Sequence, residues 1–253
     1  MTKEQDLAGK VALITGAGKN MGNGFALALA ARGADVVVHH RSESARAQAE
    51  ATAGRIRELG RRAIVVDGEL AEVAAVKRLF QQALEAFGRV DIVINNAGVV
   101  IKKPFIEVTE QDFDRSFGAN AKAAFFVMQE AARCISDNGR IINMGTTILG
   151  ATIGLYAVYA GSKAPLEDFT RALAKEIGHR GVTVNTVAPG PIDTSFYHGQ
   201  ENEASVARAT QASVAGRLGR IDDIVPVIEF LASPASQWVT AQTVFVNGGY
   251  LAR

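Results

Sequence analysis

Short apolar runs rich in β-branched residues recur along the chain, and longer segments rich in Ala, Leu, Arg and Glu separate them. The runs are apolar at consecutive positions, which is typical of strands covered on both faces of a parallel sheet. The pattern predicts strands at 11–15, 36–38, 63–66, 91–95, 140–143, 182–187 and 243–247. It predicts helices at 22–32, 43–59, 70–87, 110–135, 158–178 and 222–232.

A glycine stands just after several of these helices, where a left-handed C-cap favours that residue. These glycines are Gly33, Gly60, Gly88, Gly139 and Gly181. Because strands and helices alternate without a break in composition, we expect right-handed crossovers and a doubly wound α/β fold. The expected architecture is a single domain over residues 1–253, with a central parallel sheet of about seven strands flanked by helices.

The least regular segment is 190–216, which follows a predicted strand and begins with two prolines around a glycine. A long excursion of this kind within a compact domain is usually functional, and often a lid. We therefore predict a substrate-binding lid over 190–216. The alternative is a variable pair of surface helices.

The chain of 253 residues carries 27 Lys and Arg against 26 Asp and Glu, a formal net charge of +1. This near-balance removes the electrostatic case for binding nucleic acid or an anionic membrane. The single cysteine, Cys134, cannot form a disulfide within the chain, and its spacing to the histidines suggests no metal site. We expect a protein of a reducing compartment, which indicates a cytoplasmic location.

Residues 141–162 carry no charge and are numerous enough to cross a bilayer. They include Asn143, Thr147 and Thr152 as well as several glycines, which are unfavourable in lipid. A buried strand, a polar loop and a buried helix fit this composition better than a membrane span. The first ten residues are polar and lack the apolar core of a signal peptide.

The strand at 11–15 runs directly into the glycine-rich turn TGAGKNMGNG at 15–24, and a helix follows. In a doubly wound fold, this first turn lies beside the pyrophosphate of a dinucleotide, because glycines allow close approach and the helix N-terminus attracts phosphate. Glycines 18, 22 and 24 form an alternative frame that starts two residues later.

This turn resembles the motif of the short-chain dehydrogenase/reductase family, which has Rossmann-type folds. Thr15, Gly16 and Gly22 match the motif, whereas Asn20 replaces its middle glycine. Asn tolerates a positive φ better than other non-glycine residues, so the turn can keep its shape. The resemblance implies cofactor contacts in the turn, which we assign to Gly16, Lys19, Asn20, Met21 and Gly22.

The end of the second strand indicates which nicotinamide cofactor is bound. In the family, an acidic residue seven positions after the preceding glycine holds the 2′-hydroxyl of NAD. Counted from Gly33, that position is His40, and Arg41 and Ser42 follow it. Two cations, Arg41 and Lys19, and a hydroxyl suit a 2′-phosphate. We therefore predict NADP(H).

Further family motifs occur in order, so that the resemblance extends from Lys10 to Gly249. Asp67 resembles the family's adenine-binding aspartate, and Gly68 follows it. The tetrapeptide Asn95-Asn96-Ala97-Gly98 reproduces the family's NNAG, and a PG motif follows the sixth strand. These motifs add Asp67, Gly68, Asn95, Ala97, Gly98, Pro189, Gly190, Ile192 and Thr194 to the expected cofactor site.

Tyr159 and Lys163 are spaced i, i+4 and so share one helical face. A nearby ammonium stabilises a phenolate, which would bring the tyrosine pKa toward neutrality. The resemblance makes this pair catalytic and implies that both residues contact the cofactor. It places the family's serine at Thr146, with Thr147 as a less favoured neighbour, and the family's helix asparagine at Asn120.

These residues imply an NADPH-dependent reductase of ketones or 3-oxoacyl groups, with Tyr159 as the general acid. Two alternatives are an enoyl-thioester reductase using Tyr156, which lies seven residues before Lys163, and a catalytically silent NADP-binding regulator. The apolar stretch 148–156 suggests an uncharged substrate portion. Family behaviour further implies a homotetramer, formed through apolar stripes in 110–135 and 158–178, with residues 250–253 as part of a second interface.

Overall fold

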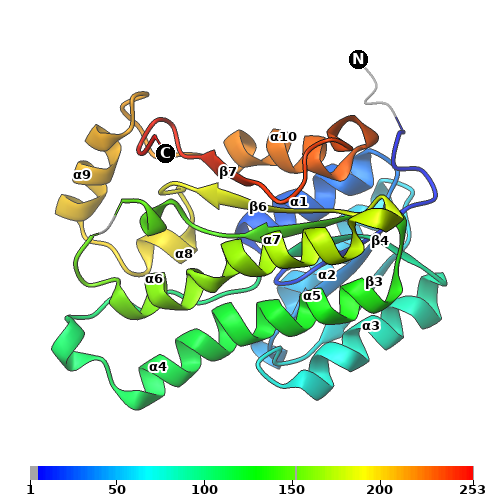
Figure 1. Cartoon of the computed structure of the whole chain (residues 1–253), viewed down its shortest axis with the longest axis horizontal. Coiled ribbons are helices and arrows are strands. Elements are labelled where there is room, and N and C mark those ends of the chain that lie inside the picture. Colours follow the sequence, from blue (N-terminus) through cyan, green and yellow to red (C-terminus); the bar gives the residue numbers. More distant parts are fainter. Residues whose placement is uncertain (1–4, 152, 253) are drawn as a thin grey trace.

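The computed structural model describes residues 5–151 and 153–252, and its centre is a parallel seven-stranded sheet (Figure 1). Thr152 and Arg253, which belong to the predicted apolar stretch and interface segment, lie outside the described residues, as do residues 1–4. The strand order is β3-β2-β1-β4-β5-β6-β7. The strands are β1 (Val11–Ile14), β2 (Asp35–His40), β3 (Ala63–Asp67), β4 (Val90–Asn95), β5 (Ile135–Met144), β6 (Thr183–Pro189) and β7 (Thr243–Val246). The predicted doubly wound α/β fold is confirmed.

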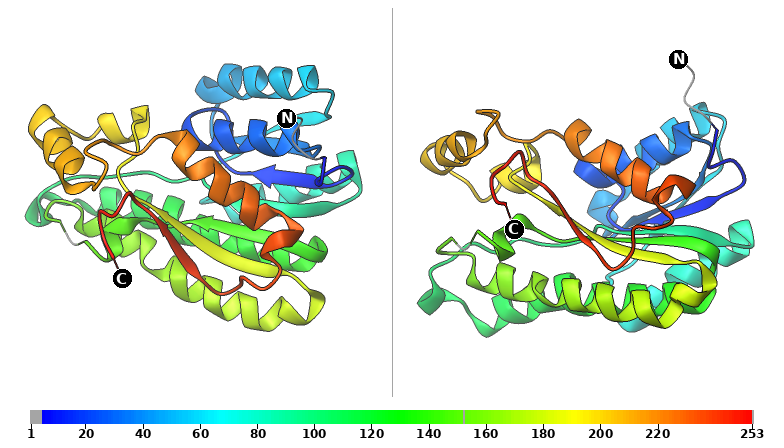
Figure 2. Two further views of the ribbon diagram at one scale, coloured as in Figure 1. Left: turned by 90° about the horizontal axis from the view of Figure 1, so that it is seen from above. Right: turned by 45° about the horizontal axis from the view of Figure 1, so that its top comes forward.

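Helices cover both faces of the sheet, as two views of the ribbon make clear (Figure 2). Their bounds are α1 (Asn20–Ala31), α2 (Arg46–Glu58), α3 (Val73–Phe87), α4 (Glu110–Phe117), α5 (Ala123–Cys134), α6 (Ala157–Lys163), α7 (Pro165–Ile177), α8 (Ser195–His198), α9 (Glu203–Ala212) and α10 (Ile221–Ala232). Neighbouring strand residues point to opposite faces. Ile14 accordingly packs with α1, α2 and α10, whereas Leu13 packs with α3, α5 and α7. This double burial explains the consecutively apolar strands.

Two predicted helices are divided in the structure. The segment predicted as 110–135 consists of α4, a π-helical turn at Gly118–Lys122, and α5. The segment predicted as 158–178 consists of α6 and α7, and α7 starts at Pro165. Proline has no backbone N–H and is favoured at the first position of a helix, which explains the second division.

Four of the five predicted C-cap glycines adopt the left-handed conformation. They are Gly33, Gly60, Gly88 and Gly181. The prediction for Gly139 is wrong, because Asn138 is the left-handed residue (φ 62°) and Gly139 lies within β5. This strand begins directly after α5 because Ile135 already pairs with Val90 of β4. A Cβ on Gly139 would lie 2.6 Å from Ile135 Cγ1, so close packing explains the glycine.

The carboxyl ends of the parallel strands lie at one edge of the sheet, and the segment 190–216 lies beside them (Figures 1 and 2). This segment contains α8 and α9. In open α/β sheets, ligands bind outside the carboxyl ends of the strands where the strand order reverses. Here that position lies between β1 and β4. Within the described residues, none of the helices has the length and apolar character to cross a membrane.

Candidate active site

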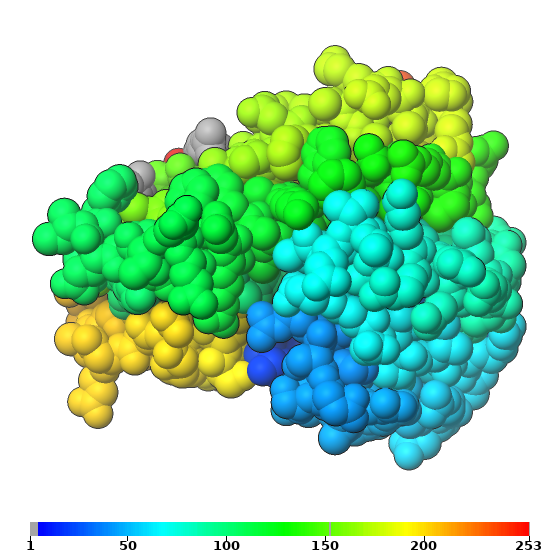
Figure 3. Space-filling model, turned by 90° about the horizontal axis from the view of Figure 1, so that it is seen from below, coloured from blue at the N-terminus to red at the C-terminus, as the bar shows by residue number. Residues whose placement is uncertain are grey.

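A cavity of about 530 Å³ lies at the carboxyl ends of β1, β2, β4 and β5. The glycine-rich turn after β1 forms one wall, and residues of the segment 190–216 form another. Because this segment is predicted to be a lid, it is called the lid segment. Figure 3 shows the surface hollowed between the lid segment, in yellow, and the region of α2, in blue. The cavity therefore stands at the point where the strand order reverses.

Hydrogen bonds between Thr15 and Asn96 fix the glycine-rich turn to the end of β4. The Thr15 hydroxyl accepts from the backbone N–H groups of Asn96 and Ala97, both at 2.9 Å. The Asn96 side chain in turn donates to the Thr15 carbonyl oxygen at 2.9 Å. Gly16 has φ 65°, and a Cβ on Gly22 would lie only 2.2 Å from the Gly16 carbonyl oxygen. Both positions therefore require glycine.

Asn20 adopts φ 50°, so the prediction that asparagine can replace the middle glycine is confirmed. Its side-chain amide donates to the Ser195 hydroxyl of α8 at 3.1 Å, which links the turn to the lid segment. The N-cap of α1 is Lys19, whose ammonium cannot accept a hydrogen bond. The first N–H groups of α1 thus keep their capacity to bind an anion.

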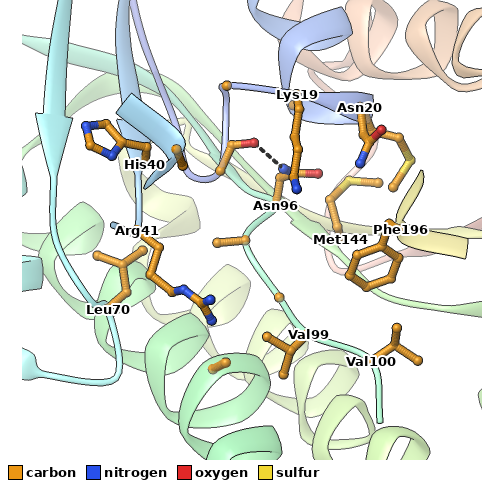
Figure 4. A pocket seen from close by; sticks show the side chains of 18 of the residues that line it. Lys19, Asn20, His40, Arg41, Leu70, Asn96, Val99, Val100, Met144 and Phe196 are labelled. Atoms are coloured by element: carbon orange, nitrogen blue, oxygen red, sulfur yellow. Dashed lines mark hydrogen bonds between the residues drawn. The ribbon is translucent and has the colours of Figure 1, made fainter. Parts of the chain in front are cut away.

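Lys19 and Arg41 both point into the cavity, from the glycine-rich turn and from the end of β2 (Figure 4). His40 and Ser42 line the same region. The sequence analysis missed Glu69, whose carboxylate lies 3.8 Å from Arg41 Nε. These two side chains are 50% and 43% exposed, so this ion pair is weak and can yield to a phosphate. The donors and cations of this wall fit the phosphates of NADP(H).

His39 is a second residue that the sequence analysis did not assign to the site. Its Nδ1 accepts from the Gly16 N–H at 3.2 Å, which leaves Nε2–H to donate to the Gly68 carbonyl oxygen at 2.9 Å. Burial lowers the pKa of His39 to about 4, so the ring is neutral at physiological pH. His39 thereby joins the glycine-rich turn to the loop after β3.

Most of the residues predicted to bind the cofactor line this cavity. They are Gly16, Lys19, Asn20, Met21, Gly22, His40, Arg41, Ser42, Gly68, Ala97, Gly98, Tyr159, Lys163 and Thr194. Apolar side chains that the sequence analysis did not single out complete the wall near the lid segment. They are Val99, Val100, Met144 and Phe196 (Figure 4).

Other predicted residues lie outside the lining of the cavity. Asn95 is buried, and its side chain donates to the Ala124 carbonyl oxygen at 3.0 Å and to Asn143 Oδ1 at 3.2 Å. It braces the sheet, while the adjacent Asn96 lines the cavity. Gly190 and Ile192 line a separate cavity of about 140 Å³. Asp67 and Pro189 end β3 and β6. Cofactor contacts from these residues stay predictions.

Tyr159 and Lys163 lie together on α6 and are 9% and 5% exposed. Lys163 Nζ donates to the Met144 carbonyl oxygen at 2.8 Å, and burial lowers the lysine pKa to about 8. The expected shift of the Tyr159 pKa toward neutrality is wrong for this structure, because burial raises this pKa and only the hydrogen bond with Thr146 acts in the opposite direction. Tyr159 is therefore protonated at neutral pH. Thr147 instead donates to the Ala188 carbonyl oxygen at 3.0 Å, so the contact to Tyr159 comes from Thr146.

Asn120 lies in the π-helical turn between α4 and α5 and is fully buried. Its side chain exchanges hydrogen bonds with the backbone of Val99, at 2.9 and 2.8 Å, and donates to the Ser162 hydroxyl at 2.9 Å. A Cβ on Gly98 would lie 2.7 Å from Asn120 Oδ1 and 3.4 Å from Lys163 Nζ. Gly98 thus packs against Asn120 and Lys163. Asn120 itself lies in a π-helical turn, a feature that often occurs at functional sites.

Tyr156 lies in a different environment. Its hydroxyl donates to a carboxylate oxygen of Glu201 in the lid segment. Burial, together with Glu201, raises the pKa of Tyr156. Of the two tyrosines, Tyr159 is thus the one that is hydrogen-bonded to Thr146, which stands at the position of the family's serine.

Residues 16–251 match a family model described as enoyl-(acyl carrier protein) reductase. The chain belongs to the short-chain dehydrogenase/reductase family, as its motifs predicted. It is 41% identical over 258 residues to the hydroxynaphthalene reductase-like protein Arp2 of Metarhizium brunneum, covering 97% of this chain and 96% of that protein. A short-chain type dehydrogenase/reductase of Picea abies is 39% identical, with 96% and 93% covered.

Solved structures give the same result for the fold and the cofactor. A dehydrogenase from Burkholderia cenocepacia with bound NADP has a TM-score of 0.95 and 42% identity, covering 99% of this chain and 96% of that chain. The angucycline C-6 ketoreductase LanV, also with bound NADP, has a TM-score of 0.91 and 34% identity, with 97% of each chain covered. Together with the cations of the cavity, these likenesses establish an NADP-dependent oxidoreductase.

The preference for NADP(H) is expected to depend on Arg41. Arg41→Asp replaces a phosphate-pairing cation with a repelling charge, so affinity for NADPH should fall roughly 10- to 100-fold. Affinity for NADH, which lacks the 2′-phosphate, should change little. Fluorescence titration with each cofactor measures the two affinities. Arg78→Asp, at an exposed position of α3, is the control for the change in charge. Equal losses for the two cofactors would contradict this assignment.

Proposed function

We propose that this protein is an NADPH-dependent carbonyl reductase, which converts a ketone or 3-oxoacyl group to a secondary alcohol. The observation that carries the proposal is the buried Tyr159, hydrogen-bonded to Thr146 and one helical turn from Lys163, at the wall of the cavity. The bound cofactor supplies a hydride for the carbonyl carbon. The chain's own residues must then bind the carbonyl oxygen and provide its proton.

The four predicted catalytic residues have distinct roles in this proposal. Tyr159 donates its proton to the carbonyl oxygen, because its raised pKa keeps it in the protonated form. The Thr146 hydroxyl stabilises negative charge that develops on that oxygen. Lys163 holds the cofactor ribose and favours the phenolate left on Tyr159. Asn120 supports the return of a proton toward Lys163.

The wall near the lid segment supports an uncharged substrate portion. Val99, Val100 and Phe196 place apolar surface there (Figure 4). The relatives named as hydroxynaphthalene reductase-like and angucycline ketoreductase favour a carbonyl on a fused-ring compound over an extended acyl chain. The description of the family model favours the enoyl-thioester alternative. The hydrogen bond from Tyr156 to Glu201 disfavours the enoyl-thioester alternative, because that alternative requires the Tyr156 hydroxyl as its acid.

Three broader proposals follow from the same reasoning. The chain works as one dinucleotide-binding catalytic domain, because residues from the glycine-rich turn to the lid segment contribute to a single cavity. The segment 190–216 acts as the lid of that cavity. A cytoplasmic location fits the dependence on NADPH and the single cysteine.

Replacing the proposed acid tests the mechanism directly. Tyr159→Phe removes the hydroxyl and keeps the ring, so turnover of a ketone should fall about 10²–10⁴-fold. Affinity for NADPH should persist. Steady-state assays with a ketone, a β-keto thioester and an enoyl thioester give turnover, and fluorescence titration gives cofactor affinity.

Tyr156→Phe is the matched control for this experiment. It removes the equivalent hydroxyl three residues away, and we expect a modest change in substrate affinity. If Tyr156→Phe abolishes turnover while Tyr159→Phe retains it, the enoyl-reductase assignment replaces the one proposed.

We further propose a homotetramer with contacts through α5 and α7. Phe125 on α5 is 41% exposed and packs edge-on against Phe169 of α7, with ring centroids 5.1 Å apart. The exposed Phe125 beside the half-buried Phe169 gives an apolar surface on adjacent helices, which favours association of copies about a two-fold axis. Light scattering at micromolar protein should give four chain masses. A mass of one or two chains would contradict the tetramer.

A further inference from the structure

Three segments of the chain meet at the carboxylate of Glu201, which follows the cavity-lining residues Gly199 and Gln200 of the lid segment. Lys102, from the loop after β4, places its Nζ 2.5 Å from Glu201 Oε2. Tyr156, at the start of α6, donates its hydroxyl to the other carboxylate oxygen. The Lys102 ammonium also lies 5.3 Å from the centre of the Tyr156 ring. The group is thus held together by three pairwise contacts.

These groups are shielded from water. The side chains of Lys102 and Glu201 are 15% and 3% exposed. Burial raises the pKa of Glu201, but hydrogen bonds from Lys102, Ser205 and Tyr156 outweigh this effect and bring it below the ordinary value. The carboxylate is therefore charged at neutral pH. A shielded ion pair is screened little by salt, and removing one partner leaves the other charge without compensation.

The two partners of Glu201 lie close along the chain to residues that line the candidate active site, although neither of them lines the cavity itself. Tyr156 lies three residues before Tyr159, and their ring centroids are 6.2 Å apart. Lys102 follows the cavity-lining residues Val99 and Val100, and the next residue, Lys103, donates its N–H to the Leu155 carbonyl oxygen at 2.9 Å. Glu201 consequently joins the lid segment to the loop after β4 and to the start of α6, the helix that carries the proposed acid.

We propose that Glu201 is a positioning residue for carbonyl reduction, which holds the lid segment against Lys102 and Tyr156 and so shapes the substrate end of the cavity. This inference rests on the proposed function. Glu201 acts through the placement of Phe196 and Gln200, which line the cavity on the same segment. Its loss should weaken substrate binding more than it slows the chemical step.

Glu201→Gln keeps the size of the side chain and removes the charge. We expect the KM for a reducible ketone to rise at least about tenfold, with kcat changed less than about threefold, since binding energy is lost equally before and in the transition state. NADPH affinity should stay unchanged. Lys102→Met should give the same result. The double variant should resemble either single variant, because both remove one shared interaction.

Lys103→Met is the matched control. It breaks a neighbouring but more exposed ion pair, in which Lys103 Nζ lies 2.6 Å from a carboxylate oxygen of Asp112 in α4. This pair does not involve the lid segment. We expect it to leave KM and kcat unchanged. If Glu201→Gln lowers kcat at constant KM, or leaves both constants unchanged, the positioning role is wrong. Additive effects in the double variant would also overturn the shared interaction.

A second measurement separates this inference from the proposed function. Trypsin cleavage at exposed Arg208 of α9, followed by mass spectrometry in the presence of NADPH, reports on the lid segment without any substrate. Glu201→Gln should be cleaved there faster than the unmodified protein, and Lys103→Met should not. If the protein reduces no carbonyl compound but Glu201→Gln shows this change, the proposed function fails and the lid contact stands. Equal cleavage rates would overturn the lid contact itself.

Discussion

The hydrogen bonds between Thr15 and Asn96 are the constraint on which the candidate site depends. They join the ends of β1 and β4, which are neighbours in the sheet. After β1 the chain continues into α1 on one face, and after β4 it leads to α5 on the other. The two connections therefore separate at this point and leave a crevice. Gly98, which follows this junction, packs against Asn120 and Lys163. The segment that borders the dinucleotide cavity therefore also contacts two of the proposed catalytic residues.

Burial sets the protonation states of the groups on which the reaction depends. It raises the pKa of Tyr159, which keeps the phenol in its protonated form. It lowers the pKa of Lys163 to about 8 and that of His39 to about 4. The folded state thus disfavours the charged forms of both bases, and His39 can accept a hydrogen bond from Gly16 because its ring is neutral.

The sequence predicted those features that depend on local pattern. The strands are apolar because both faces are buried, and the glycine-rich turn and the Tyr159–Lys163 pair follow from spacing along one segment. What it missed depends on contacts between distant segments. Asn138 rather than Gly139 adopts the left-handed conformation because Ile135 pairs with β4. The partners Arg41 and Glu69, and likewise Lys102 and Glu201, are far apart in sequence, so only the fold brings their charges together.

The central claim is that the hydride reaches a carbonyl carbon while Tyr159 protonates the oxygen. A cyclic enone offers the same site both a carbonyl group and an activated carbon–carbon double bond. With NADPH carrying deuterium at C4 of the nicotinamide, mass spectrometry and NMR of the product locate the transferred atom. We expect an allylic alcohol with deuterium on the carbinol carbon. A saturated ketone with deuterium at the β-carbon would contradict it.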